Sequence, residues 1–231
     1  MATSGTYAFN PSLGELTLYA FNNIGVRATA LTQEHMESAR MAANLMLATF
    51  ANKGVNLWAV DLVTVPLIEG QATYDVGANT VMILDAYMEI DDGVTPPVDR
   101  IIMPISRSSY ASYPNKEQQG MTSVYWFDRL IAPTITLWPV PDGTSAQYLK
   151  YYRVRWLQDA GFTSGQTVEV PYLWLEAVAL GLAARLAPIW APDRLPMVKP
   201  LAEEAYQAAA LQNVEDVPTF ISPSINSYYR P

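Results

Sequence analysis

Hydrophobic residues recur at spacings of three and four across Thr32–Gly54, a pattern that predicts the longest helix of the chain. Thr32 can cap its start, and Lys53 followed by Gly54 is typical of its end. One side carries Met36, Ala39, Ala43, Met46, Leu47 and Phe50, and the opposite side carries Met41, Leu45 and Ala48. Because both sides are apolar, we expect other helices, from the two ends of the chain, to cover most of this helix.

Three further segments have helical periodicity. The first spans Asn10–Gly25, where Ser12 and Glu15 have the spacing of a capping box. The second, Tyr172–Trp190, is almost entirely apolar but contains Glu176 and Arg185, so it predicts a buried helix in preference to a membrane span. We expect Leu47 and Phe50 to pack against it, over Leu173–Leu186. The third helix covers about Pro196–Val214.

Between the helical segments the periodicity changes to that of strands. Alternating or β-branched segments separated by Pro and Gly predict five strands: Val55–Val65, Val81–Ile90, Ser123–Arg129, Thr134–Pro139 and Ala146–Trp156. In the second of these, Leu84, Ala86, Met88 and Ile90 should share one face. Ser106–Tyr113 is expected to form a single helical turn. Short strands with such punctuation favour an antiparallel sandwich or a small barrel.

The last residues, Val217–Pro231, contain three prolines and alternating apolar residues, and we predict an extended arm. The predicted fold is therefore α+β. Helices from residues 1–54 and 162–216 form a discontinuous four-helix bundle, into which a β domain of residues 55–161 is inserted, and residues 217–231 form the C-terminal arm.

Composition indicates a protein that works in an assembly. Of 231 residues, 50% are hydrophobic and only 16% are charged, and there are 14 Tyr, 6 Trp and 9 Met. Part of this apolar surface should be buried against partners. The net charge of −8 argues against a protein that grips nucleic acid through its phosphates, although it allows DNA to slide past. The first residues lack the features of a signal peptide.

The sequence gives little support for catalysis or for a cofactor. It has no cysteine and a single histidine, His35, which lies in the first turn of the longest helix and is interpreted as a solvated or capping residue. We find no nucleophile elbow, zinc-binding or phosphate-binding motif, and predict neither enzymatic activity nor a resident metal. An acidic set could line a strand face beside a turn and bind calcium, but we interpret it as solvated: Asp85, Glu89, Asp91 and Asp92.

Half of the basic residues fall in the β domain, interleaved with aromatic ones. This combination can bind single-stranded nucleic acid, but carboxylates in the same segments nearly cancel the positive charge. A protein–protein surface is therefore the preferred interpretation. The candidate residues for contacts with other subunits or with the tail are Arg107, Tyr110, Tyr113, Lys116, Arg129, Arg153 and Arg155.

Three stretches resemble a known family. They are ANKGVNLW (Ala51–Trp58), SRSSYASYPNKEQQGMTSVYWFDRLIAPTITLWPVPDG (Ser106–Gly143) and YYRVRWLQDAG (Tyr151–Gly161). Their order and spacing are similar to those of the head-to-tail adaptors, or tail accessory factors, of tailed and especially short-tailed bacteriophages. The likeness extends over nearly the whole chain, from the first helix through the last.

The resemblance implies a virion protein at the head–tail junction, assembled in the host cytoplasm. Such a protein forms a ring, usually of twelve copies, beneath the portal. The ring extends the DNA channel and presents a platform to the tail nozzle or tube. It further implies that the C-terminal arm reaches the portal, through Phe220, Ile221, Ile225, Tyr228, Tyr229 and Arg230.

Two other classes stay open from the residues. One is a polysaccharide-binding or calcium-binding β module on a helical stalk, for which Asp85–Asp92 and exposed aromatic residues would be the evidence. The other is a cell-wall hydrolase of a virion, which would need a pair of carboxylates beside a groove.

Overall fold

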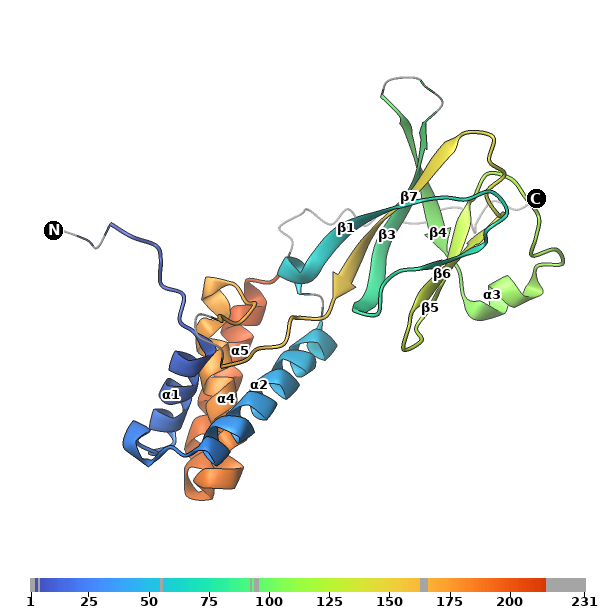
Figure 1. Ribbon diagram of the computed structural model, residues 1–231. Helices are drawn as coiled ribbons and strands as arrows, with labels where there is room; N and C mark the ends of the chain where they lie inside the picture. Colours follow the sequence, from blue (N-terminus) through green and yellow to red (C-terminus); the bar gives the residue numbers. More distant parts are fainter. Residues whose placement is uncertain are drawn as a thin grey trace, which may run out of the picture.

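The computed structural model describes residues 3, 5–54, 56–91, 93, 96–162 and 166–214. A helical part and a sheet part lie side by side (Figure 1), each with its own cluster of buried hydrophobic residues. The predicted α+β class is confirmed. The domain boundaries stay a prediction, although the helices on either side of the sheet part in sequence do share one core. The helices are α1 (Leu13–Asn23), α2 (Gln33–Lys53), α3 (Arg107–Ser112), α4 (Leu175–Trp190) and α5 (Leu195–Leu211).

The predicted starts of the first two helices are confirmed. Ser12 and Glu15 form a capping box at α1. Thr32 caps α2, where the Thr32 backbone N–H donates to His35 Nδ1 over 3.3 Å. The ring of His35 also stacks on Trp190 of α4, with 3.8 Å between the ring centroids. His35 therefore caps α2 and packs α2 against α4.

Helix α4 is the centre of the helical part, and it packs against α1, α2 and α5. With the turn before it, α4 forms a stretch, Tyr172–Trp190, whose length and hydropathy would suit a membrane span. More than half of that stretch is buried inside the protein, as expected for a core helix. Leu47 and Phe50 are buried as predicted, and Phe50 contacts Trp174 with 5.4 Å between ring centroids.

The second apolar side of α2 differs from the prediction. Met41 is 60% exposed and Leu45 is 54% exposed, so no helix of the described chain covers them. The expectation that the chain's own helices surround α2 is wrong on this side. The reason is that α2 packs in the shared helical core through one face only, which carries Ala39, Ala43, Met46 and Phe50.

The sheet part contains one curled seven-stranded sheet, with the order β1-β7-β3-β4-β5-β6-β2. Most pairs are antiparallel, but β4 and β5 run parallel. The predicted antiparallel sandwich or barrel is thus replaced by a single sheet, which curls so that all but one of its strands contribute fully buried residues to one core. The strands are β1 (Val60–Pro66), β2 (Thr73–Asp75), β3 (Thr80–Asp91), β4 (Val98–Pro104), β5 (Val124–Asp128), β6 (Thr134–Trp138) and β7 (Ala146–Arg155).

The alternation predicted along β3 is largely confirmed. Ala86, Met88 and Ile90 are buried on one face. Leu84, predicted on that face, is instead 36% exposed, because the pairing of β3 with β7 shifts register between Ile83 and Asp85. A shift of one residue turns the preceding side chains to the other face of the sheet.

Candidate interaction surfaces

The short helix α3 is held on the sheet by stacked aromatic rings. Ser106 caps the helix by accepting a hydrogen bond from the Ser109 backbone N–H. Two tyrosines three residues apart then lie on one side of the helical turn. Their stacking partners come from β5 and β6: Tyr110 lies 5.4 Å from Trp126, and Tyr113 lies 4.1 Å from Trp138, between ring centroids.

A lysine closes this cluster from the outside. Lys116 Nζ donates to the carbonyl oxygens of Ala111 (3.3 Å) and Tyr113 (3.1 Å). It also lies 5.6 Å from the centroid of the Tyr110 ring, within cation–π range. Arg107 is exposed at the start of α3. We call the half-exposed surface of Arg107, Tyr110, Tyr113, Lys116, Trp126 and Trp138 the α3 platform.

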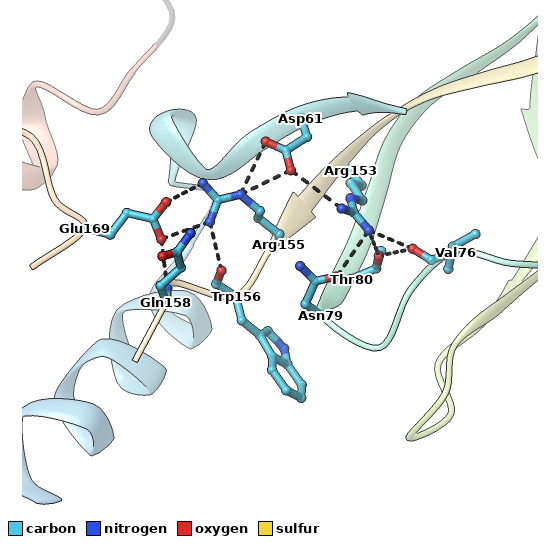
Figure 2. Close-up of polar contacts among 9 residues, drawn as sticks. All are labelled: Asp61, Val76, Asn79, Thr80, Arg153, Arg155, Trp156, Gln158 and Glu169. Atoms are coloured by element: carbon cyan, nitrogen blue, oxygen red, sulfur yellow. Dashed lines mark hydrogen bonds and ion pairs between the residues drawn. The ribbon is translucent and has the colours of Figure 1, made fainter. Parts of the chain in front are cut away.

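Arg153 and Arg155, predicted as interface residues, lie elsewhere. Figure 2 shows Arg155 at the end of β7, between a carboxylate of β1 and one that precedes α4. Its guanidinium reaches Glu169 through two hydrogen bonds of 2.9 and 2.5 Å, and its Nε lies 3.1 Å from Asp61 Oδ2. Glu169 also accepts from the Gln158 backbone N–H over 2.8 Å.

The electrostatics at Glu169 follow from this geometry. The hydrogen bonds from Arg155 lower the pKa of the Glu169 carboxyl below its ordinary value, against the opposing effect of burial. The same hydrogen bonds raise the pKa of Arg155. Since Glu169 lies just before α4 and its preceding turn, and Arg155 ends β7, the pair ties the sheet part to the helical part. We call Asp61, Arg155 and Glu169 the junction.

Arg153, two residues before Arg155 and on the same face of β7, also pairs with Asp61, with 3.7 Å between its Nη2 and Asp61 Oδ2. Its Nη1 donates to the Val76 carbonyl (2.8 Å), Thr80 Oγ1 (3.1 Å) and Asn79 Oδ1 (3.2 Å), as Figure 2 shows. An interface role for Arg153 and Arg155 stays a prediction, but both guanidinium groups are engaged within the chain. Sequence reasoning missed their partners, because Asp61 and Glu169 are far from them in sequence and carry no local motif.

The remaining predicted residues have different outcomes. Arg129 is exposed where β5 ends, with its guanidinium 6.0 Å from the Phe127 ring. The six predicted portal-binding residues, from Phe220 to Arg230, lie outside the described residues. Just before that segment, Asn213 Oδ1 accepts from the Leu57 backbone N–H over 3.0 Å, which fixes the end of the helical part beside the start of the sheet.

The acidic set considered for calcium is not gathered into a cluster. Glu89 forms an ion pair with Lys150, its diagonal neighbour on β7. Asp91 Oδ1 accepts from the Gly93 backbone N–H, as in a turn. Asp92 lies outside the described residues, and the part of the chain that the structure describes holds no group of three His, Asp or Glu side chains able to share a metal ion.

Large apolar side chains are exposed on both parts of the molecule, including Phe9, Tyr19 and Met41 on the helical part and Ile101, Leu130 and Ile131 on the sheet part. So much exposed apolar surface on a folded α+β chain is typical of a protein that makes contacts with other proteins.

The chain belongs to the SU10 adaptor protein family, whose model matches residues 24–222. No curated protein matches the chain at a significant level. Membership agrees with the resemblance to phage head-to-tail adaptors and gives the coarse function of a phage structural adaptor. An adaptor of this kind implies a virion location at the head–tail junction and association with portal and tail proteins.

Proposed function

We propose that this protein is the head-to-tail adaptor of a tailed phage and forms a ring beneath the portal that extends the DNA channel and docks the tail. The observation that carries the proposal is the family match over residues 24–222. We infer twelve copies, as the resemblance implies. The subunit is then a compact bundle of α1, α2, α4 and α5 with a β platform beside it.

The surfaces of the subunit support a ring. Met41 and Leu45 form an exposed apolar stripe on α2, and Tyr19 of α1 and Leu173 before α4 are exposed elsewhere on the helical part. Side-by-side packing of helical parts would bury such surfaces. With a net charge of −8, twelve copies would line a channel with little affinity for the DNA phosphates.

Two further contacts complete the proposal. The α3 platform offers aromatic rings and positive charge to a tail nozzle or tube protein, and such residues are enriched at the centres of protein interfaces. The arm of residues 217–231 provides the contact with the portal, because its apolar residues suit strand addition or insertion into pockets.

The test is capture by the portal. Full-length protein mixed with purified portal should give, by native mass spectrometry, a complex with twelve adaptor copies per portal ring. A chain that ends at residue 216 should keep the helical circular dichroism and melting point of the full chain, yet fail to bind. If the shortened chain assembles normally, the attachment lies on the helical part; if neither chain binds, the adaptor assignment is wrong.

The proposal includes the absence of enzymatic activity. A cell-wall hydrolase would clear a zymogram of peptidoglycan, and we expect no clearing. A sugar-array and a calcium titration test the alternative of a carbohydrate-binding or calcium-binding module in the same way, and we expect neither to show binding.

A further inference from the structure

The hairpin between β5 and β6 ends in an exposed apolar tip. Ile131 is 97% exposed and Leu130 is 59% exposed. Beside them, Arg129 makes no ion pair with any carboxylate of the described residues. Hairpin loops normally carry polar or turn-forming residues, so two large aliphatic side chains at a tip indicate a buried position in an assembly. We call Arg129, Leu130 and Ile131 the hairpin tip.

A groove of matching chemistry lies in the helical part. It is formed between α1 and α4 and has a volume of about 520 Å³. Its floor is apolar, with Leu16 and Ala179 buried, and its rim includes the exposed rings of Phe9 and Tyr172, which meet edge to face at 6.2 Å. We call it the α1–α4 groove.

Two carboxylates line the α1–α4 groove, and only one is engaged. Glu15 is used in the capping box of α1, where its hydrogen bonds with Ser12 lower the pKa of its carboxyl. Glu176 is exposed in the first turn of α4, and within the described residues it has no hydrogen bond or ion pair. The groove therefore holds one free negative charge beside an apolar floor.

We propose that the hairpin tip of one copy inserts into the α1–α4 groove of the next copy, with Arg129 paired to Glu176. This contact rests on the proposed ring and names its subunit interface. Arg129, which has no ion pair within the described residues, and the free carboxylate of Glu176 complement each other in charge, and Leu130 and Ile131 would cover apolar surface. In Figure 1 the β5–β6 hairpin projects from the lower edge of the sheet part, and α1 lies on the side of the helical part that faces away from the sheet. A contact between different patches of two identical chains is heterologous, which is the type that closes into rings.

The exposed stripe of α2 is a poorer occupant of the groove. Met41 lies one turn after Glu37, so a neighbouring α2 would bring a carboxylate towards Glu15 and Glu176. Like charges brought together in an interface are unfavourable. Charge therefore selects the hairpin tip over the α2 stripe.

Cysteine cross-linking tests the contact directly, because the full chain contains no cysteine. One size-tagged copy carries Ile131→Cys and an untagged copy carries Leu173→Cys at the groove. On the portal-bound ring, mild oxidation should give a tagged–untagged disulfide dimer. Ile101→Cys, on β4 and 76% exposed, is the matched control for Ile131→Cys and should give at least tenfold less of this dimer with Leu173→Cys.

Charge exchange adds a second readout. Arg129→Glu and Glu176→Arg should each raise the protein concentration needed for half-maximal ring assembly at least tenfold. Combining the two substitutions in one chain should restore assembly at the wild-type concentration. Ile131→Asp should weaken assembly similarly, whereas Ile101→Asp should not.

Three results would overturn the contact. Normal rings from Arg129→Glu or Ile131→Asp would do so and would leave the proposed function intact. Preferential cross-linking of Ile131→Cys to Met41→Cys in place of Leu173→Cys would assign the tip to the α2 stripe. A wild-type chain that stays monomeric with the portal would overturn the ring itself, and this contact with it.

Discussion

Two aromatic clusters, one inside the helical part and one on the sheet part, are built from the same residue types. In the inner cluster, Trp174 lies 5.4 Å from Phe50, 4.8 Å from Trp58 and 5.6 Å from Tyr206, between ring centroids. Lys53 Nζ lies 3.7 Å from the Tyr206 ring. The outer cluster is the α3 platform, which also combines tryptophan, tyrosine and a lysine.

The clusters differ in where their members come from. The inner rings are supplied by α2, by the turns before β1 and α4, and by α5, so they join segments from both ends of the chain. The outer rings all fall within residues 110–138 and join α3 to the two strands beneath it. The inner cluster therefore holds the fold together, whereas the outer one positions a surface that can bind a partner.

The largest expected effect is in the inner cluster. Phe50→Ala should lower the free energy of unfolding by about 3–5 kcal/mol, because Phe50 is only 5% exposed and rings on two sides prevent collapse of the cavity. Urea unfolding followed by circular dichroism measures the change. Met41→Ala, on the exposed side of α2, is the control and should change it by less than about 0.5 kcal/mol. A loss below about 1 kcal/mol for Phe50→Ala would show that α2 and α4 do not pair as described.

The junction, which connects the regions of the two clusters, should give the next largest effect. Glu169→Gln should cost about 1–3 kcal/mol of unfolding free energy at neutral pH, because it leaves the mostly buried Arg155 without its closest charge partner. The matched control is Asp193→Asn, because the Asp193 carboxylate is mostly exposed in its ion pair with Arg194. This control should change the free energy of unfolding by less than about 0.5 kcal/mol.

The effect of Glu169→Gln should depend on pH in a defined direction. The folded-state pKa of Glu169 lies below its ordinary value of 4.5, so the folded protein binds this proton more weakly than the unfolded chain does. The stabilisation is then complete above the unfolded pKa and is lost as pH falls through the folded pKa. The difference between wild type and variant should therefore shrink below about pH 4.5. A constant difference down to about pH 3 would contradict the ion pair.

The outer cluster should separate stability from binding. Trp126→Ala removes the ring under Tyr110 and should cost about 1–2 kcal/mol, less than Phe50→Ala, because Trp126 is only half-buried. Binding to the tail nozzle protein, measured by interferometry with assembled rings, should weaken more than tenfold. Unchanged tail binding would place the tail contact elsewhere on the subunit. If Trp126→Ala unfolds the whole protein, the outer cluster is needed for the fold and not only for binding.

Local sequence signals were sufficient for the helices. Ser12 with Glu15, and Thr32 at the start of the longest apolar pattern, predicted where α1 and α2 begin, because capping depends on residues within one turn. The packing of Phe50 against Leu173–Leu186 was also predicted from the apolar character of that segment, and Trp174 within it contacts Phe50.

The sheet was predicted less completely. Strand β2 has three residues and β4 has no clear alternation, so neither gives a period-two signal. The order of strands and the junction depend on contacts such as Arg155 with Asp61, ninety-four positions apart, which no local pattern reports. For the same reason, the sequence alone could not show that Arg153 and Arg155 bond within the chain, whereas the other five candidate interface residues lie on the surface.

The smallest expected effect is on the affinity for DNA. This measurement tests whether the positive charge of the outer cluster binds a protein or a nucleic acid. If the α3 platform binds protein, Lys116→Ala should leave duplex DNA binding unchanged, because wild type, at net −8, should bind random duplex only weakly at physiological salt. The same variant should still weaken tail binding, since Lys116 holds the turn after Tyr113 through the carbonyl oxygens of Ala111 and Tyr113. Fluorescence anisotropy with a labelled random duplex makes the first measurement. Submicromolar binding with a steep salt dependence, reduced by Lys116→Ala, would instead make the outer cluster a nucleic-acid surface and the channel proposal wrong.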